Sequence, residues 1–210
     1  TDAGKTWKKM GLDLSQHISR ISIHPKNPDI VYVAAQGALY SSSTERGVFK
    51  SIDGGKTWSK VLYVDDKTGC VELSMDMNNP LILYAAMWEH GRLPWKVISG
   101  GPGSGLYKSV DGGEHWEKIQ NGLPKELGKM SIAVCRSNPD RVYALIESDS
   151  EQELGGLFVS VNAGKSWSLV TKDHRLIQRA WYYIELFTDP LDEHTIYVLS
   201  APALRSIDGG

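Results

Sequence analysis

Hydrophobic and polar positions follow the same order four times along the chain. Each repeat opens with an apolar run, at residues 18–23, 71–75, 130–135 and 182–187. A turn with Asn-Pro or Asp-Pro follows, and then a second apolar run, at residues 30–35, 81–87, 141–146 and 195–199. Short runs bounded by turn residues, with little helical periodicity, predict β-strands.

A third run leads into a recurring motif, whose fullest copy is Ser-Ile-Asp-Gly-Gly-Lys-Thr-Trp at residues 51–58. The Asp can bond nearby amides, and the two glycines allow the positive φ that a tight hairpin needs. The Trp opens a fourth strand and is large enough to cover the hairpin end. We expect a structural role for Ser51, Asp53, Gly55, Trp58, Ser109, Asp111, Gly113, Trp116, Ser160, Asn162, Gly164 and Trp167.

The Asp or Asn of the motif stands at positions 2, 53, 111, 162 and 208, which gives intervals of 51, 58, 51 and 46 residues. Four antiparallel strands in each interval, repeated at this period, predict an all-β fold, a β-propeller. Consecutive apolar residues within the second runs agree with blades that are covered on both faces.

We expect a single propeller segment over residues 1–210. The predicted blades are 1–10 (partial), 18–64, 70–120, 129–171 and 181–210 (partial). A seven-bladed ring would need roughly 350 residues, and the motif tail at residues 2–7 duplicates the turn at 206–210. The pattern therefore favours a segment cut from a longer propeller, whose other blades the parent chain supplies.

Composition adds few constraints. The 210 residues have a formal net charge of −2, which gives no general reason to expect nucleic acid as a partner. The sequence contains no run of about 18 apolar residues and therefore predicts no transmembrane helix. Cys70 and Cys135, the two cysteines, lie in apolar runs, and we expect buried free thiols.

Strand order places the loops on two faces. The Pro-containing turns and the Asp motifs lie on one face. The irregular stretches lie on the other, where binding groups usually gather: residues 11–17, 38–46, 63–67, 88–104, 147–154 and 173–181.

The stretch 88–104 is the most informative of these irregular loops. It combines aromatic, acidic and basic side chains with a glycine-rich return. Such groups suit a sugar or a peptide terminus, and the alternative is a lid whose Trp residues pack on the next blade. The ligand-binding candidates on this face are Trp88, His90, Arg92, Trp95, Arg175, Arg179 and Trp181.

The sequence gives weaker evidence for catalytic residues than for ligand-binding residues. Glycoside hydrolysis needs two carboxyl groups at a defined separation. Asp65 and Asp66 are adjacent and point apart, so Glu89 or Asp13 would have to join one of them. The alternative is a solvated loop. The scattered His residues lack metal-ligand spacing, and we expect no metal and no cofactor.

The motif Ser-x-Asp-x-Gly-x-Thr-Trp is similar to the Asp-box, or bacterial neuraminidase repeat. Asp-boxes occur in sialidases, xyloglucan-degrading endoglucanases, sortilin-type receptors and a photosystem II assembly factor, so the resemblance implies a propeller and no particular activity. The sialidase pattern of an arginine triad with a Tyr/Glu pair and an Asp acid is not placed here.

Residues 63–69, 83–89, 100–109 and 181–183 resemble large bacterial sortilin/VPS10-like proteins. That group is often labelled glycosyl hydrolase, and the resemblance implies a secreted, periplasmic or outer-membrane-associated protein. We expect a non-catalytic segment that binds a carbohydrate, protein or peptide ligand. The alternatives are part of a polysaccharide-active glycoside hydrolase, with carboxylates split across blades, and an assembly factor for a membrane complex.

Overall fold

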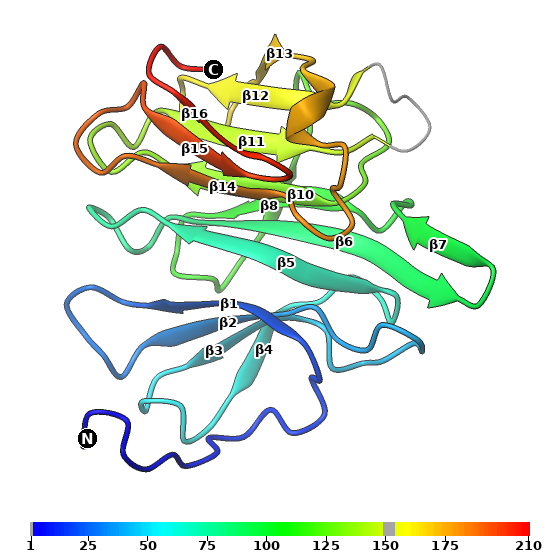
Figure 1. Cartoon of the computed structure of the whole chain (residues 1–210). Helices are drawn as coiled ribbons and strands as arrows, with labels where there is room; N and C mark the ends of the chain where they lie inside the picture. Colours follow the sequence, from blue (N-terminus) through cyan, green and yellow to red (C-terminus); the bar gives the residue numbers. More distant parts are fainter. Residues whose placement is uncertain (1, 149–153) are drawn as a thin grey trace.

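The fold is an arc of four antiparallel β-sheets arranged as propeller blades (Figure 1). The structure is a computed structural model, and it describes residues 2–148 and 154–210. Blade 1 contains β1 (Ile18–Ile23), β2 (Val31–Ala35), β3 (Gly47–Ser51) and β4 (Ser59–Leu62). The four apolar runs of the first repeat thus become one sheet, as predicted.

The other blades repeat this order. Blade 2 contains β5 (Thr68–Met75), β6 (Leu83–Leu93), β8 (Gly105–Ser109) and β9 (Glu117–Ile119), and β7 (Lys96–Ser99) pairs with the end of β6. Blade 3 contains β10 (Met130–Val134), β11 (Val142–Ile146), β12 (Gly156–Ser160) and β13 (Ser168–Thr171). Blade 4 contains β14 (Glu185–Thr188), β15 (Ile196–Leu199) and β16 (Ala203–Ser206).

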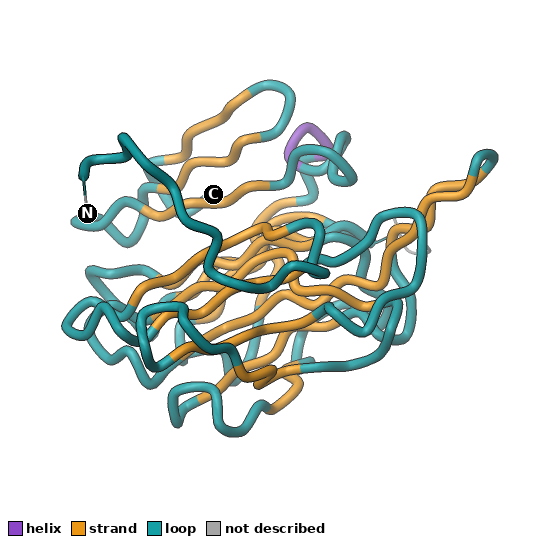
Figure 2. The backbone as a smooth tube through the Cα atoms, turned by 90° about the horizontal axis from the view of Figure 1, so that it is seen from below, coloured by secondary structure: helices purple, strands orange, loops and turns teal. Residues whose placement is uncertain are grey.

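The ends of the chain differ from complete blades. Residues 2–17 contain no strand, and the motif Trp at position 7 is 90% exposed, so the fourth strand expected to start there is not formed. Instead, Met10 accepts a hydrogen bond from the indole of Trp58, and Leu12 packs on blade 1. The N-terminal segment therefore lies against the outer face of the first blade (Figure 2).

Apolar side chains fill each of the three blade interfaces. One cluster joins Tyr32 and Val48 of blade 1 to Leu73 and Leu83 of blade 2. Two further clusters lie between blades 2 and 3 and between blades 3 and 4. The consecutive apolar runs are thus explained, because both faces of a central blade are buried.

The motif turns have one repeated hydrogen-bond pattern. In the first full copy, Ser51 Oγ donates to Asp53 Oδ1 and accepts from the amide of Gly55, both at 2.8 Å. Asp53 also accepts from the amide and the hydroxyl of Thr57. A Cβ on Gly55 would lie 3.3 Å from the Trp58 ring, so the ring lies over the turn.

The same turns connect neighbouring blades. Tyr32 Oη of β2 and Lys50 Nζ of β3 both donate to the carbonyl of Gly112, in the motif of blade 2, at 2.8 Å. Tyr84 Oη and Lys108 Nζ make the same contacts with the carbonyl of Ala163 in blade 3. The motif therefore serves as a clasp between blades.

Both cysteines are free and buried. Burial raises the pKa of the Cys70 thiol far above its usual range and that of Cys135 to about 12. Both side chains therefore act as small apolar core groups.

Candidate functional site

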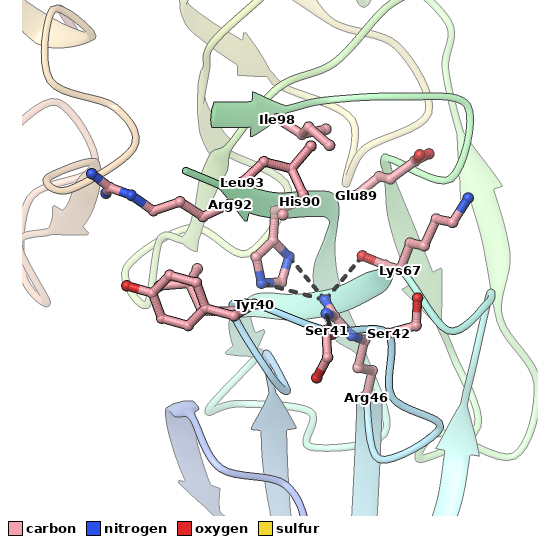
Figure 3. A pocket seen from close by; sticks show the side chains of 12 residues that line it. Tyr40, Ser41, Ser42, Arg46, Lys67, Glu89, His90, Arg92, Leu93 and Ile98 are labelled. Atoms are coloured by element: carbon pink, nitrogen blue, oxygen red, sulfur yellow. Dashed lines mark hydrogen bonds between the residues drawn. The ribbon is translucent and has the colours of Figure 1, made fainter. Parts of the chain in front are cut away.

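The irregular stretches gather at the ends of the blades opposite the motif turns, on what we call the loop face. A pocket of about 340 Å³ lies there, between the loop after β2 and the β6–β7 hairpin (Figure 3). Its volume is near the lower end of the range of roughly 300–1,000 Å³ that is usual for ligand sites. The pocket is lined by Leu39, Tyr40, Ser41, Ser42, Arg46, Lys67, Glu89, His90, Gly91, Arg92, Leu93 and Ile98.

The stretch 88–104, expected as an irregular loop, is mostly regular structure. β6 continues to Leu93, and β7 returns antiparallel to it, so that His90 is paired with Ser99 and Arg92 with Val97. The hairpin projects from the blade (Figure 1). The strand extends because Trp88 belongs to the apolar run and is itself 1% exposed, so that the buried strand continues through it.

Arg46 forms the buried floor of the pocket. Its side chain reaches under the loop after β2, where its guanidinium donates to the carbonyls of Gln36, Ala38, Ser41 and Lys67. Arg46 is 1% exposed, and burial lowers its pKa. Each of these hydrogen bonds fixes a loop backbone, so Arg46 shapes the pocket.

His90 stands beside Arg46 and is neutral at physiological pH. Burial, reinforced by the charges of Arg46 and Lys129, lowers its pKa to about 4. Its Nδ1 lies 3.2 Å from the carbonyl oxygen of Trp88 and 3.1 Å from Arg46 Nη1, and its Nε2 lies 3.3 Å from Arg46 Nη1 and from Gln36 Nε2. Because an acceptor faces only Nδ1, we assign the proton to Nδ1 and the acceptor role to Nε2.

Trp88 and Trp181 are packing residues at this site. The rings of Trp88 and His90 stack with centroids 4.4 Å apart, and Trp181 meets Trp88 edge-on at 4.8 Å. Lys129 Nζ lies 5.2 Å from the centroid of the Trp88 ring. Trp88 and His90, both named as ligand-binding candidates, are therefore buried beneath the loop face.

Exposed aromatic rings lie in the pocket wall and near the pocket. Tyr40 is 75% exposed on its wall, and Trp95 is 80% exposed at the hairpin tip. Arg92 lies at the rim, and its Nη1 donates to Tyr182 Oη at 3.1 Å. The structure therefore adds Tyr40 and Tyr182, which the sequence analysis did not single out, to Arg92 and Trp95.

Two of the four carboxylates considered above approach the same glycine. Glu89 Oε2 accepts a hydrogen bond from the amide of Gly103 at 3.0 Å, and a Cβ on Gly103 would lie 3.0 Å from Asp65 Oδ2. Asp66 is exposed and does not take part, while Asp13 pairs with Lys9 at 2.7 Å. Asp65 and Glu89 are thus brought together around the backbone of the glycine-rich return.

The other two arginines lie apart from the pocket. Arg175 is bound to its neighbour Asp173 at the start of the 3-10 helix η2 (His174–Leu176). Arg179 is exposed, and its carbonyl accepts from the amides of Tyr182 and Tyr183. They do not form an anion clamp with Arg92. Of the loop 147–154, residues 149–153 lie outside the described part of the chain.

A second polar cluster lies on the inner strands. Arg20 of β1 forms a two-pronged ion pair with Glu72 of β5, at 2.6 and 2.7 Å, and its Nη2 also contacts Glu185 of β14 at 2.7 Å. Ser131 of β10 donates to Glu72. The four residues Arg20, Glu72, Ser131 and Glu185 occupy equivalent positions in the four repeats. A comparison of polar residues at this position of each repeat could have predicted the cluster from the sequence.

The described residues contain no group of three His, Cys, Asp or Glu side chains placed to hold a metal ion. In the same residues, no helix has the length and apolar character needed to cross a bilayer.

Comparisons with known proteins agree with the fold. The family model described as BNR/Asp-box repeat matches residues 49–60. No curated protein matches the sequence. Among solved structures, the GH74 xyloglucanase from Xanthomonas campestris is similar, with a TM-score of 0.67, 17% identity and 91% of this chain covered. The fold and the repeat together define an Asp-box β-propeller.

Two further structures share this architecture. The GH74 enzyme from Niastella koreensis has a TM-score of 0.61 at 21% identity over 92% of this chain, and YCF48 from Cyanidioschyzon merolae has 0.56 at 18% over 97%. The chain spans 28% and 30% of the Xanthomonas and Niastella enzymes and 57% of YCF48.

Proposed function

We propose that this chain is a non-catalytic, ligand-binding part of an Asp-box β-propeller, and that its loop face binds a carbohydrate. The observation that carries the proposal is the pocket between Tyr40 and the β6–β7 hairpin, with Arg92 and Tyr182 at its rim. An exposed aromatic ring offers an apolar face to a sugar ring, while neighbouring hydroxyl, carboxylate and guanidinium groups bond its hydroxyls.

Several features favour binding over catalysis at this site. Arg46 and His90 are buried beneath the pocket and occupied with loop carbonyls and with each other. Glu89 is already bonded to the amide of Gly103. The groups at the pocket surface therefore serve to orient a ligand, and a peptide is the other ligand class that such a surface accepts.

Glycan-array screening of the chain, followed by calorimetry on the best ligand, tests the proposal. Xyloglucan oligosaccharides are the first probes, because one structural neighbour is a xyloglucanase. We expect Tyr40→Ala to weaken binding about tenfold, which corresponds to the loss of roughly 1.4 kcal/mol of ring contact. Trp7→Ala is the matched control, because Trp7 is also exposed but lies in a motif turn.

A glycoside hydrolase is the second candidate, favoured by the approach of Asp65 and Glu89 to Gly103. Turnover of a glycan by the chain, abolished in both Asp65→Asn and Glu89→Gln, would establish it and overturn the non-catalytic reading. Binding without turnover, weakened about tenfold in Tyr40→Ala, would support the leading proposal. The sortilin/VPS10-like relationship and export from the cell stay predictions.

A further inference from the structure

The clasps between blades 1 and 2 and between blades 2 and 3 use the same pair of side chains. Lys50 is paired with Tyr32 across β2 and β3, and Lys108 with Tyr84 across β6 and β8. Each ammonium nitrogen lies over the ring of its tyrosine, 5.8 and 5.4 Å from the ring centroid, and donates to a carbonyl of the next Asp-box. The two interfaces can therefore be compared position by position.

The charge beside the lysine differs between these two interfaces. In the first, Lys50 Nζ pairs with Glu114 Oε1 at 2.6 Å, and Glu114 stands three residues after the Asp of its motif. In the second, the residue three positions after the motif Asn is Lys165. Within residues 2–148 and 154–210, neither Lys108 nor Lys165 forms an ion pair. A lysine thus replaces the carboxylate that balances the first interface.

Lys108 is partly buried at this position and keeps donor capacity. Burial lowers the pKa of its ammonium group, and the charge of Lys165 lowers it further, while Asp140 and Glu117 act in the opposite sense without reaching ion-pair distance. An ammonium group has three N–H donors, and the described residues give Lys108 Nζ one hydrogen-bond acceptor, the carbonyl of Ala163 at 2.6 Å. Donors therefore remain for a ligand.

A groove of about 470 Å³ lies beside these two lysines, along β9 and next to the Asp-box turn of blade 3. It is larger than the pocket of about 340 Å³ on the loop face. Blades 2 and 3 are both complete, and each packs against a further blade on its other side, so both walls of the groove are formed within this chain. Its polar lining includes Lys108, Lys165, Gln120 and Asn121.

Hydrogen bonds hold the wall of the groove in place. Asn121 Nδ2 donates to the carbonyl of Lys165 at 3.3 Å, and the amide of Trp167 donates to the carbonyl of Asn121 at 2.9 Å. The end of β9 is thereby tied to the Asp-box turn that carries Lys165. Val110 and Ile119 add apolar surface to the lining. The groove is thus preformed and combines positive charge with apolar surface.

We propose that this groove binds a tetrahedral anionic group, the sulfate or phosphate of an ester, between the ammonium groups of Lys108 and Lys165. Two like charges without a carboxylate partner favour an anion at this place, because hydrogen bonds from ammonium groups to oxyanions are charge-assisted and strong. The volume leaves room for the organic part of the ester beside Val110 and Ile119.

The lining also favours a tetrahedral anion over a carboxylate. No arginine is among the described residues that line the groove. A planar carboxylate is best bound by the two-pronged fork of an arginine, whereas lysine acts as a point charge that suits phosphate-type groups. The groove and the loop-face pocket share no lining residue, so this site does not depend on carbohydrate binding at the loop face.

Calorimetry of the full chain at constant ionic strength tests the site with probes that share one sugar: glucose sulfate, glucose phosphate, glucuronate and glucose. We expect the esters to bind, and glucuronate and glucose to bind about tenfold more weakly or less. Lys165→Glu installs the carboxylate of the first interface and would weaken ester binding about tenfold. Lys56→Glu makes the same charge change at the same position of the first Asp-box, so it is the control and would leave binding unchanged.

Circular dichroism confirms that each variant is folded, and Lys165→Gln is the second variant, which removes the charge without adding a carboxylate. A preference for either ester identifies the ligand group and supports the proposal. Three outcomes would overturn it: no binding of either ester, glucuronate bound as tightly as the esters, or ester binding that both Lys165 variants leave unchanged. Ester binding that only Tyr40→Ala weakens would belong to the loop-face pocket and would also overturn it.

Discussion

The hydroxyl of Tyr32 donates a 2.8 Å hydrogen bond to the carbonyl of Gly112, which lies 80 residues further along the chain in the Asp-box of the next blade. Tyr32 is only 2% exposed, so this hydrogen bond is shielded from water. The Asp-box thereby closes its own hairpin and ties two blades together. Its recurrence in the sequence reflects this structural role.

Tyr32→Phe removes only the hydroxyl of this clasp. We expect the free energy of unfolding to fall by about 1 kcal/mol, because a buried hydrogen bond contributes roughly 0.5–1.5 kcal/mol. Tyr197→Phe, at the equivalent position of β15, is the matched control and would change stability little, because the Tyr197 hydroxyl makes no hydrogen bond within residues 2–148 and 154–210. Urea unfolding measures both, and equal effects would contradict the clasp.

Asp53 gives the first Asp-box a defined dependence on pH. Hydrogen bonds from Thr57, together with one from Ser51, lower the pKa of its carboxyl group to about 2. A lowered pKa means that the ionised group stabilises the fold above about pH 4 and loses this effect as pH falls towards 2.

Asp53→Asn is the informative variant, because Asn162 fills the same position in blade 3 with similar contacts. We expect this variant to fold but to be less stable than wild type at pH 7. The difference in urea midpoint would shrink as pH falls from about 4 to about 2. A difference that stays constant over that range would show that the charge is not involved.

His90 produces a second dependence on pH, of the same direction but at higher pH. Burial lowers its pKa to about 4, below the value of about 6.5 expected in the unfolded chain. The unfolded state therefore binds a proton first, and stability is full above pH 6.5 and falls as pH drops towards 4. The loss between pH 6.5 and pH 5 is at most about 2 kcal/mol, since one pKa unit corresponds to 1.36 kcal/mol.

His90→Phe keeps a ring to stack on Trp88 but cannot titrate. We expect its unfolding free energy to decline less between pH 6.5 and pH 5 than that of wild type. NMR titration of the His90 ring gives a direct measurement, and a midpoint near pH 6.5 would be inconsistent with the buried neutral state.

The backbone at the start of β3 has a conformation that favours glycine at position 47. The φ of Gly47 is +112°, and a Cβ there would lie 2.0 Å from the carbonyl oxygen of Leu62. We expect Gly47→Ala to cost at least about 2 kcal/mol, because backbone must move. At Gly105, the same position in blade 2, a Cβ would meet the flexible end of Lys118 instead, so Gly105→Ala would cost less. Thermal unfolding of the two variants would reveal the difference.

The sequence was sufficient to predict the propeller because the fold repeats. Four copies of the same apolar and turn order identify strands without any knowledge of tertiary contacts, and the positions of the Asp-box Trp residues follow from them. The fourth strand expected at Trp7 is not formed, and the residues after it pack on blade 1 instead.

The candidate site was only partly predictable. The sequence singled out the stretch 88–104, part of which lines the pocket, but it did not separate the buried Trp88 and His90 from the more accessible Arg92 and Trp95, because that depends on where β6 leaves the blade. The apolar run that continues through Trp88 could have predicted from the sequence that Trp88 is buried. Tyr40 and Tyr182 come from different loops, and only the fold brings their loops to the same face.

Hydrogen exchange of the chain, with and without the best ligand from the glycan array, tests the central claim most directly. The account predicts protection in residues 38–46, 89–99 and 181–183 on the loop face, with the Asp-box turns unchanged. Protection centred on residues 51–58 or 109–116, with the loop face unaffected, would contradict it.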